Sequence, residues 1–200
     1  MYEIGNAEMF PIETVKETFL TSIQIKQRIV DDEEICNAIA KAAEIIADSL
    51  SKGGKVLICG NGGSASDALH FSGEIVGRFQ KERKAAPAIP LNADVVTMTA
   101  VGNDYGYDMI FERGVQAFMK KEDVFIGIST SGNSENVLRA VRAVKEMGGT
   151  TIAFLGKTGG KIKNEVDIPI VVPSDNTARI QESHICIIHI ICDLVEKTLV

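Results

Sequence analysis

The chain has 200 residues, of which 45% are hydrophobic and 24% charged, and its formal net charge is −6 at pH 7. This length and composition are typical of one folded domain, and the negative charge without a basic run argues against nucleic acid as the main ligand. No stretch reaches about 18 uninterrupted apolar residues, so we expect no membrane span. The N-terminus lacks the basic-then-apolar order of a signal peptide, and the four cysteines form no CxxC pair, so we expect a cytoplasmic protein.

Two helices are expected before the first strand, over residues 11–31 and 33–51. Apolar residues recur at helical spacing in both, and Asp31-Asp32 interrupts the pattern and can cap the second helix. Gly53-Gly54 then ends that helix. We expect residues 1–53 to form a helical hairpin that must bury an apolar stripe, and we favour a contact with another subunit over one with the domain itself.

From residue 54 to 200, predicted strands and helices alternate. Strands are expected over residues 56–59, 88–91, 95–100, 124–128, 150–155 and 168–172. Helices are expected over residues 64–79, from the turn at 102–106 to about 121, and over 135–147 and 178–199. The charged loop 80–87 is interpreted as solvated surface. The strands are apolar runs rather than alternating patterns, which favours a parallel sheet covered on both faces. We therefore expect one α/β domain over residues 1–200.

The most informative stretch is residues 56–78, VLICGNGGSASDALHFSGEIVGR. A strand, a glycine-rich turn at Asn61-Gly62-Gly63 and a helix opening at Ser64 would direct backbone N–H groups at an anion. His70 and Glu74 are four residues apart, so both leave the same helix face. They would lie roughly 9–15 Å from the anion site. The pair can transfer protons or bind a metal.

A second hydroxyl-rich turn, STSGNSE, follows the strand at 124–128 and precedes a helix. It carries Ser129, Thr130, Ser131 and Ser134 around a glycine. Hydroxyl groups and helix N-terminal amides suit a phosphate monoester. Neither turn contains lysine or arginine, and the Walker GxxxxGK[ST] pattern is absent, so an ATPase is a poor match.

A dinucleotide site is the alternative interpretation of the first turn. Gly60, Gly62 and Ala65 satisfy G-x-G-x-x-A after a strand. The acidic residue expected about 20 positions later is not clearly present, and the second turn has no role in that scheme. We therefore favour two phosphate-type turns.

The terminal helix carries further polar residues in the run RIQESHICIIHII, including Gln181, His184 and His189. Burying such groups without partners costs roughly 1–3 kcal/mol each, so a cleft along this helix is expected. Gln181 and His189 lie about 80° apart around the helix and two turns apart along it. His184 and His189 lie about 140° apart and are not expected to serve one site. Spacing alone does not choose between the two histidines.

Together, CGNGGSASDALHFSGE, AVGNDYG, GISTSGNS and TARIQESHICIIH resemble the phosphoheptose isomerases of the SIS (sugar isomerase) domain family. The resemblance runs from about residue 15 to the C-terminus. It implies a Rossmann-like SIS domain with a five-stranded parallel sheet flanked by helices, assembled as a homotetramer with sites at subunit interfaces. It also implies conversion of sedoheptulose 7-phosphate to D-glycero-D-manno-heptose 7-phosphate, early in the synthesis of activated heptose for bacterial surface polysaccharide such as lipopolysaccharide.

The resemblance also implies roles for individual residues and selects His189 over His184. Glu74 and His189 match a catalytic acid–base pair, and the matched zinc ligands, for one Zn²⁺ per subunit, are His70, Glu74, Gln181 and His189. The matched substrate-binding positions are Asn61, Gly62, Gly63, Ser64, Glu74, Asn103, Asp104, Ser129, Thr130, Ser131, Ser134 and Gln181. The alternative is a non-catalytic SIS protein that associates with the bacterial replication initiator. That relative lacks the equivalents of Glu74 and His189, so we favour the enzyme.

Overall fold

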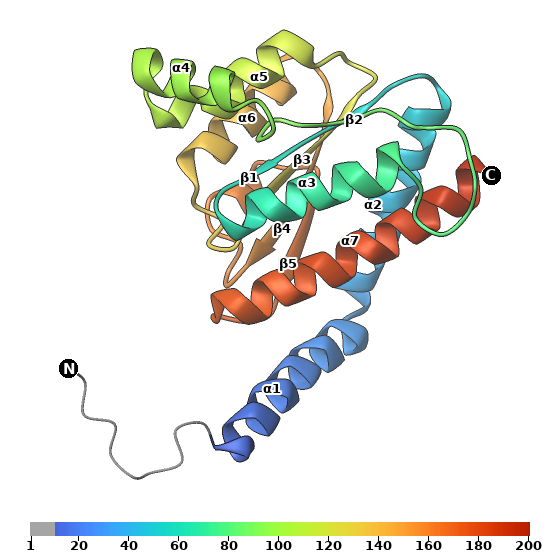
Figure 1. The fold of residues 1–200 in the computed structure, drawn as a ribbon, viewed down its shortest axis with the longest axis vertical. Coiled ribbons are helices and arrows are strands. Elements are labelled where there is room, and N and C mark those ends of the chain that lie inside the picture. The colour runs from blue at the N-terminus through green and yellow to red at the C-terminus, as the bar shows by residue number, and fades with distance from the viewer. Residues whose placement is uncertain (1–10) are drawn as a thin grey trace.

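The structure is a computed structural model and describes residues 11–200 (Figure 1). Its elements in chain order are α1 (Ile12–Asp31), α2 (Glu33–Ser51), β1 (Val56–Gly60), α3 (Gly63–Val76), β2 (Ala88–Pro90), α4 (Val95–Tyr105), η1 (Tyr107–Met109), α5 (Ile110–Phe118), β3 (Val124–Ser129), α6 (Glu135–Glu146), β4 (Thr150–Gly156), η2 (Ile162–Asn164), β5 (Ile168–Val172) and α7 (Thr177–Leu199). None of the helices in residues 11–200 has the length and apolar character that a membrane crossing requires.

The five strands form one parallel sheet in the order β2-β1-β3-β4-β5, which confirms the expected five-stranded parallel sheet. The chain first adds β2 on one side of β1 and then places β3 on the other side. In open α/β sheets, ligands bind at the carboxyl ends of strands where this reversal occurs. Gly60 at the end of β1 lies opposite Ile128 of β3, so the turns after these two strands are neighbours.

Two helical layers cover the sheet, as the apolar strands predict. On one face α2, α3 and α7 pack with side chains such as Phe71 and Ile188 against Ile58. On the other face α5 and α6 pack with side chains such as Phe111 against Leu57. Figure 1 shows α3 and α7 side by side, and they contact each other along their length.

The two N-terminal helices differ from the predicted hairpin. They are joined by the single residue Asp32, whose carboxylate caps α2 by accepting hydrogen bonds from Glu34 N and Ile35 N. One linking residue is too short for an antiparallel return, and α1 projects away from the sheet layers (Figure 1). Of its apolar residues, only Ile25 and Ile29 are buried. Exposed apolar side chains remain at Ile12, Val15, Phe19, Leu20, Ile23 and Val30.

The predicted strand at residues 95–100 is wrong, because these residues form the first half of α4. Asp94 caps this helix, and its carboxylate accepts hydrogen bonds from Thr97 N at 3.0 Å and Thr97 Oγ1 at 2.5 Å. The β-branched residues favour a strand locally, but the Asp94 cap directs the chain into a helix that does not join the sheet. No residue of α4 is buried.

Candidate active site

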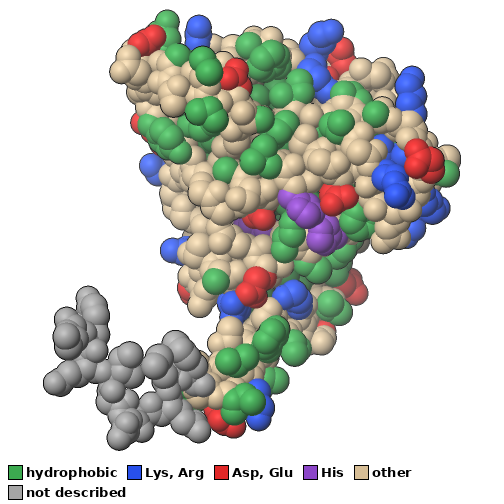
Figure 2. Space-filling model, in the orientation of Figure 1, with side chains coloured by type: hydrophobic (Ala, Val, Ile, Leu, Met, Phe, Trp, Pro, Cys, Tyr) green, Lys and Arg blue, Asp and Glu red, His purple; other side chains and the backbone are tan. Residues whose placement is uncertain are grey.

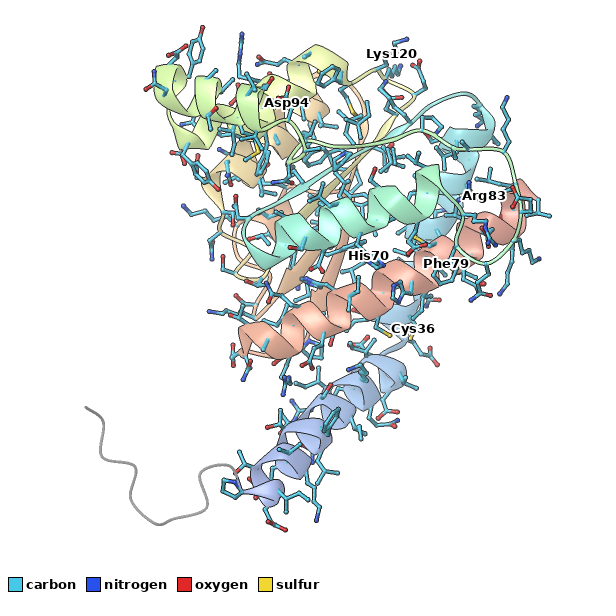
Figure 3. The ribbon with its side chains drawn as sticks, in the orientation of Figure 1. Cys36, His70, Phe79, Arg83, Asp94 and Lys120 are labelled. Atoms are coloured by element: carbon cyan, nitrogen blue, oxygen red, sulfur yellow. The ribbon has the colours of Figure 1, made fainter. Side chains whose placement is uncertain are left out.

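His70, Glu74 and His189 lie together on the surface between α3 and α7. The two Nε2 atoms of the histidines are 2.9 Å apart, and His70 Nε2 lies 3.2 Å from Glu74 Oε1. His70 keeps 43% of its side chain exposed, whereas Glu74 and His189 are half-buried. Figure 2 shows histidine side chains at the surface with an acidic side chain beside them, and Figure 3 places His70 on α3 facing α7. The three side chains therefore form one cluster that solvent can reach.

These three groups fit a zinc ion by type and spacing. Within residues 11–200, they are the one set of three His, Cys, Asp or Glu ligand atoms that lie within 4.8 Å of one another. Imidazole nitrogens and a carboxylate oxygen are common zinc ligands, and ligands bound at about 2.0–2.2 Å around a tetrahedral ion stand roughly 3.3 Å apart. The observed separations of 2.9 and 3.2 Å are close to that value.

Gln181 occupies a different place in this chain. Its amide rests against the backbone of Gly63, where even an added Cβ would overlap Gln181 Nε2. Seven residues of α3 separate Gly63 from His70, a rise of roughly 10 Å. Within one chain the structure therefore brings together three of the four predicted zinc ligands and places Gln181 at the first turn.

His184 lies on the inner face of α7. Its Nε2 is 2.9 Å from the carbonyl oxygen of Leu155 at the end of β4, and the side chain is fully buried. Burial lowers the pKa of His184 to about 4, and the hydrogen bond to Leu155 only partly opposes this. His184 and His189 therefore serve different places, as their spacing predicts.

Asp67 adds a carboxyl group one turn before His70 that the sequence reasoning missed. Its Oδ2 is buried and has no hydrogen-bond partner among residues 11–200. Burial raises the pKa of Asp67 to about 6, while the charge of His70 acts in the opposite direction. Asp67 is thus a fourth titratable group, beside the cluster of His70, Glu74 and His189.

The first turn is joined to the start of α6 by a pair of amide side chains. Asn61 Nδ2 donates to Asn136 Oδ1, and Asn136 Nδ2 donates to Asn61 Oδ1, both at 2.9 Å. The hydroxyl of Tyr107 also donates to Asn61 Oδ1, at 2.8 Å. Neither Tyr107 nor Asn136 was predicted. Asn136 directly follows the STSGNSE motif and Tyr107 directly follows AVGNDYG, but neither motif indicates that the two side chains meet at Asn61.

The second turn is held by its own hydroxyls and by a third loop. Ser129 and Ser134 share a hydrogen bond of 2.9 Å between their Oγ atoms, and Ser131 Oγ accepts from Asn133 N.

The loop after β4 contacts this turn at Gly132. Gly132 has φ +66°, and any Cβ there would overlap the carbonyl oxygen of Gly159. Ile162 N donates to Gly132 O, and Lys161 N donates to Asn133 Oδ1. The loop after β4, through Gly159, Lys161 and Ile162, thus fixes the backbone of the second turn.

The remaining predicted substrate-binding residues lie at the edges of this region. Ser64 is buried in the first turn of α3. Asn103 and Asp104 are in the last turn of α4 and exposed, and Asn103 Nδ2 donates to Asp104 Oδ1. In the part of the chain that the structure describes, no hydrogen bond joins these two residues to either turn. Within a single chain they are not brought to the cluster.

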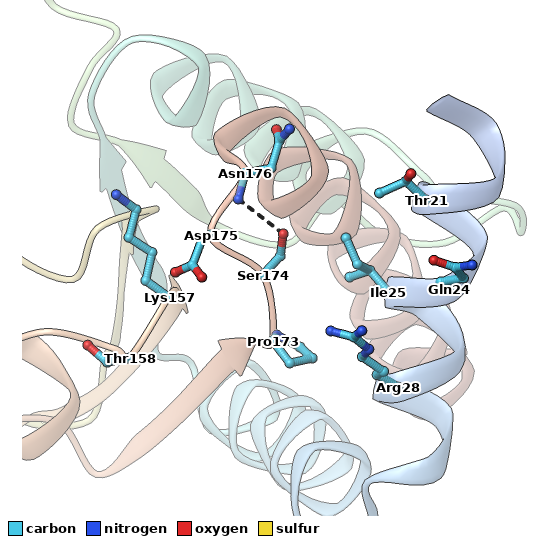
Figure 4. A pocket seen from close by; sticks show the side chains of 10 residues that line it. All are labelled: Thr21, Gln24, Ile25, Arg28, Lys157, Thr158, Pro173, Ser174, Asp175 and Asn176. Atoms are coloured by element: carbon cyan, nitrogen blue, oxygen red, sulfur yellow. Dashed lines mark hydrogen bonds between the residues drawn. The ribbon is translucent and has the colours of Figure 1, made fainter. Parts of the chain in front are cut away.

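A separate cavity of about 480 Å³ lies between α1 and the start of α7 (Figure 4). Its lining includes Arg28 of α1, Lys157 after β4, and Asp175 and Asn176 before α7. None of the predicted site residues lines it. The candidate active site is instead an open surface between α3 and α7, continued by the two turns at the carboxyl ends of β1 and β3.

Comparison with known proteins covers nearly the whole chain. The family model of the SIS domain matches residues 19–156. Phosphoheptose isomerase of Clostridium acetobutylicum is 52% identical over 179 residues, 90% of this chain and 91% of the relative. The same enzyme of Geobacter sulfurreducens is 55% identical over 168 residues, 84% and 89% of the two chains. The solved phosphoheptose isomerase from Francisella tularensis has a TM-score of 0.90 at 41% identity and covers 94% of this chain and 100% of its own.

Proposed function

Because the chain belongs to the phosphoheptose isomerases of the SIS domain family, a group of sugar-phosphate isomerases of heptose biosynthesis, we propose a specific reaction for it. The substrate is sedoheptulose 7-phosphate and the product is D-glycero-D-manno-heptose 7-phosphate. This is the first step toward ADP- or GDP-activated heptose for bacterial surface polysaccharide, lipopolysaccharide included. The observation that carries the proposal is the meeting of Glu74 and His189, one general acid–base candidate from each of two helices, beside two phosphate-type turns.

Glu74 and His189 perform the proton transfers in this proposal. One of them removes a proton from C1 of the ketose, the C2 carbonyl oxygen takes up a proton to become a hydroxyl, and an enediol forms between C1 and C2. The other then delivers a proton to C2 while the C1 hydroxyl gives up its proton and becomes the carbonyl, so that in sum one proton has moved from C1 to C2 and one from O1 to O2, and the aldose results. His70 lies within hydrogen-bonding distance of both groups and orients them.

The two turns bind the phosphate and the sugar hydroxyls. Ser129, Thr130, Ser131 and Ser134 form the phosphate site, which lies at the carboxyl end of β3 and at the start of α6. Asn61, held by Tyr107 and Asn136, presents the first turn to the sugar chain. The separation of roughly 10 Å along α3 between the first turn and His70 is one that an extended sugar phosphate can span.

Zinc is part of the proposal as a resident ion. His70, Glu74 and His189 would hold it, and Gln181 would join them only by leaving Gly63 or by coming from another copy of the chain. When bound, the ion would polarise the sugar carbonyl and stabilise the negative charge of the enediolate.

A homotetramer is the proposed assembly. Apolar side chains are exposed along α1, with Phe19 at 68%, and also around the histidines at Leu69, Val76, Ile190 and Leu194. Exposed apolar surface of this extent is typical of subunit contacts. Burying it would also enclose the open site between α3 and α7 and exclude water from the enediol.

The proposal is tested by incubating the purified protein with sedoheptulose 7-phosphate and following the sugar by NMR, with and without a chelator. We expect the aldose phosphate to appear. A ketose that stays unchanged, both with added Zn²⁺ and without it, would contradict the proposal.

A further inference from the structure

The loop of residues 77–87, which joins α3 to β2, is held by one buried carboxylate. Glu196 on α7 accepts hydrogen bonds from Phe79 N at 2.9 Å, Gln80 N at 2.7 Å and Lys81 N at 2.8 Å. We name residues 77–87 the strap. Its middle was interpreted from sequence as solvated surface, and for Arg83 that interpretation is wrong, because this side chain is only 2% exposed.

Arg83 connects the strap to the candidate catalytic residues. Its Nε lies 3.3 Å from Glu196 Oε1, and the Glu196 side chain is also 2% exposed. One terminal nitrogen of Arg83 donates to the main-chain oxygen of Glu74 at 2.9 Å, and the other donates to Lys84 O at 3.1 Å. The planar guanidinium thus donates hydrogen bonds to the strap and to the last turn of α3. Its link to α7 is the ion pair with Glu196, since Nε makes no hydrogen bond within residues 11–200.

Phe79 connects the strap to His189. The two ring centroids are 5.6 Å apart, a distance typical of packed aromatic rings. Figure 3 shows Phe79 and Arg83 on the strap beside the C-terminal half of α7. Glu196 follows His189 by seven residues, about two turns of the same helix. The carboxylate that fixes the strap therefore also fixes the ring that packs against His189.

The buried ion pair of Arg83 and Glu196 is not explained by protein stability alone. Two ions removed from water lose much of their solvation, and apolar residues of similar size often replace such a pair without loss of stability. Burial by itself would raise the pKa of Glu196, but the three strap N–H groups and Arg83 lower it below its ordinary value. The carboxylate is therefore held in its charged form, as an acceptor for the strap.

We propose that Arg83 and Glu196 are positioning residues for the isomerase reaction: they fix the backbone of Glu74 and the ring of His189 through the strap. The inference rests on the proposed function, because it assigns the reaction to Glu74 and His189. Misplacing reacting groups by about 1 Å can cost as much as 100-fold in rate. The pair acts through other residues and does not touch the sugar.

The test compares Arg83→Met and Glu196→Gln with a matched control, Asp123→Asn. Asp123 also forms a buried ion pair, with Lys55 at 2.5 Å, and accepts hydrogen bonds from Lys55 N and Lys120 N. It precedes β3, at the edge of the sheet opposite the turns. We expect the strap variants to lower kcat about 10- to 100-fold with less than about a threefold change in KM. The control is expected to lose thermal stability and keep kcat.

The second readout is independent of activity. The chain has three histidines, so NMR of protein labelled at histidine can resolve each imidazole. In the strap variants the signals of His70 and His189 are expected to shift, and that of His184 is expected to stay. Equal kcat losses in Asp123→Asn, or wild-type kcat and imidazole signals in both strap variants, would overturn the inference.

If both strap variants fail to fold, Phe79→Leu tests the inference instead, because it removes the aromatic ring that packs against His189 and keeps Arg83 and Glu196. A several-fold lower kcat with a shifted His189 signal supports the inference, and unchanged values overturn it. If wild-type protein does not convert sedoheptulose 7-phosphate, the proposed function fails. The imidazole signals then still show whether the strap holds His189.

Discussion

The Nε2 atoms of His70 and His189 lie 2.9 Å apart, although 119 residues separate them in the sequence. Two neutral imidazoles can share one hydrogen bond at this distance only if one donates and the other accepts. Both nitrogens can instead point at a common ion or at substrate. Glu74, 3.2 Å from His70, completes the group and gives it an acid–base partner.

Measured zinc affinities should show that His70 is a zinc ligand and that Gln181 is not. We expect His70→Ala to weaken Zn²⁺ binding at least about 10-fold, since loss of groups at a metal site commonly costs 10- to 100-fold. Gln181→Ala should raise KM and leave zinc affinity within about threefold, because its amide lies at Gly63. Competition with a chromophoric chelator measures both affinities. A large loss of zinc affinity in Gln181→Ala would show that Gln181 is a ligand in the assembled protein.

The second turn depends on glycine at position 132. Gly132→Ala should raise KM for the sugar phosphate at least about 10-fold, because a Cβ would displace the Gly159 carbonyl and open the turn. Gly53→Ala is the matched control, since Gly53 also has positive φ, +86°, but a Cβ added there would meet no atom within 4 Å. Steady-state kinetics on both variants provides the comparison. The same KM in Gly132→Ala as in the control would argue against this turn as the phosphate site.

Acid should destabilise the protein through His184. Its pKa is about 4 in the folded state and near 6.5 when unfolded, so between these values the unfolded chain binds the extra proton. Stability from this group is therefore present above pH 6.5 and falls as the pH drops toward 4, by about 3 kcal/mol in total. Urea unfolding at several pH values should show this slope in wild type and a flatter one in His184→Gln. Parallel slopes would show that His184 does not titrate in this way.

Assembly should depend on the apolar face of α1. Phe19→Asp places a charge at the centre of this exposed face and is expected to shift the protein from four times the 21.6 kDa chain mass to smaller species. Glu17→Gln on the same helix is the control and should leave the mass unchanged. Light scattering after size-exclusion chromatography measures the mass. A wild-type protein that runs as a monomer would contradict the proposed tetramer.

Local sequence patterns predicted most of the scaffold. Buried strands such as Val124–Ser129 appear as apolar runs, and the glycine and serine turns after β1 and β3 mark the carboxyl edge of the sheet. The helix at Val95 was missed because β-branched residues favour strands locally, while Asp94 caps a helix that lies outside the sheet.

Long-range partners were beyond prediction from the sequence. Arg83 and Glu196 are 113 positions apart, and Tyr107 and Asn61 are 46 apart. The first pair is set by how the strap packs on α7, and the second by how η1 packs beside α6 and the first turn. No periodic pattern in the sequence encodes either contact. For the same reason, spacing along α7 left the choice between His184 and His189 open. In the packed structure His184 points inward and contacts Leu155, whereas His189 lies at the surface beside His70.

The most direct test of the account is an NMR time course of sedoheptulose 7-phosphate in D₂O with wild type, Glu74→Gln and His189→Ala. Because the proton delivered to C2 comes from a side chain that equilibrates with solvent, the aldose phosphate should carry deuterium at C2. Both variants should be slower by at least about 100-fold, the size expected for loss of a general acid or base. Near-normal turnover in either variant, or no conversion by wild type, would contradict the assignment of Glu74 and His189 as the proton-transfer pair.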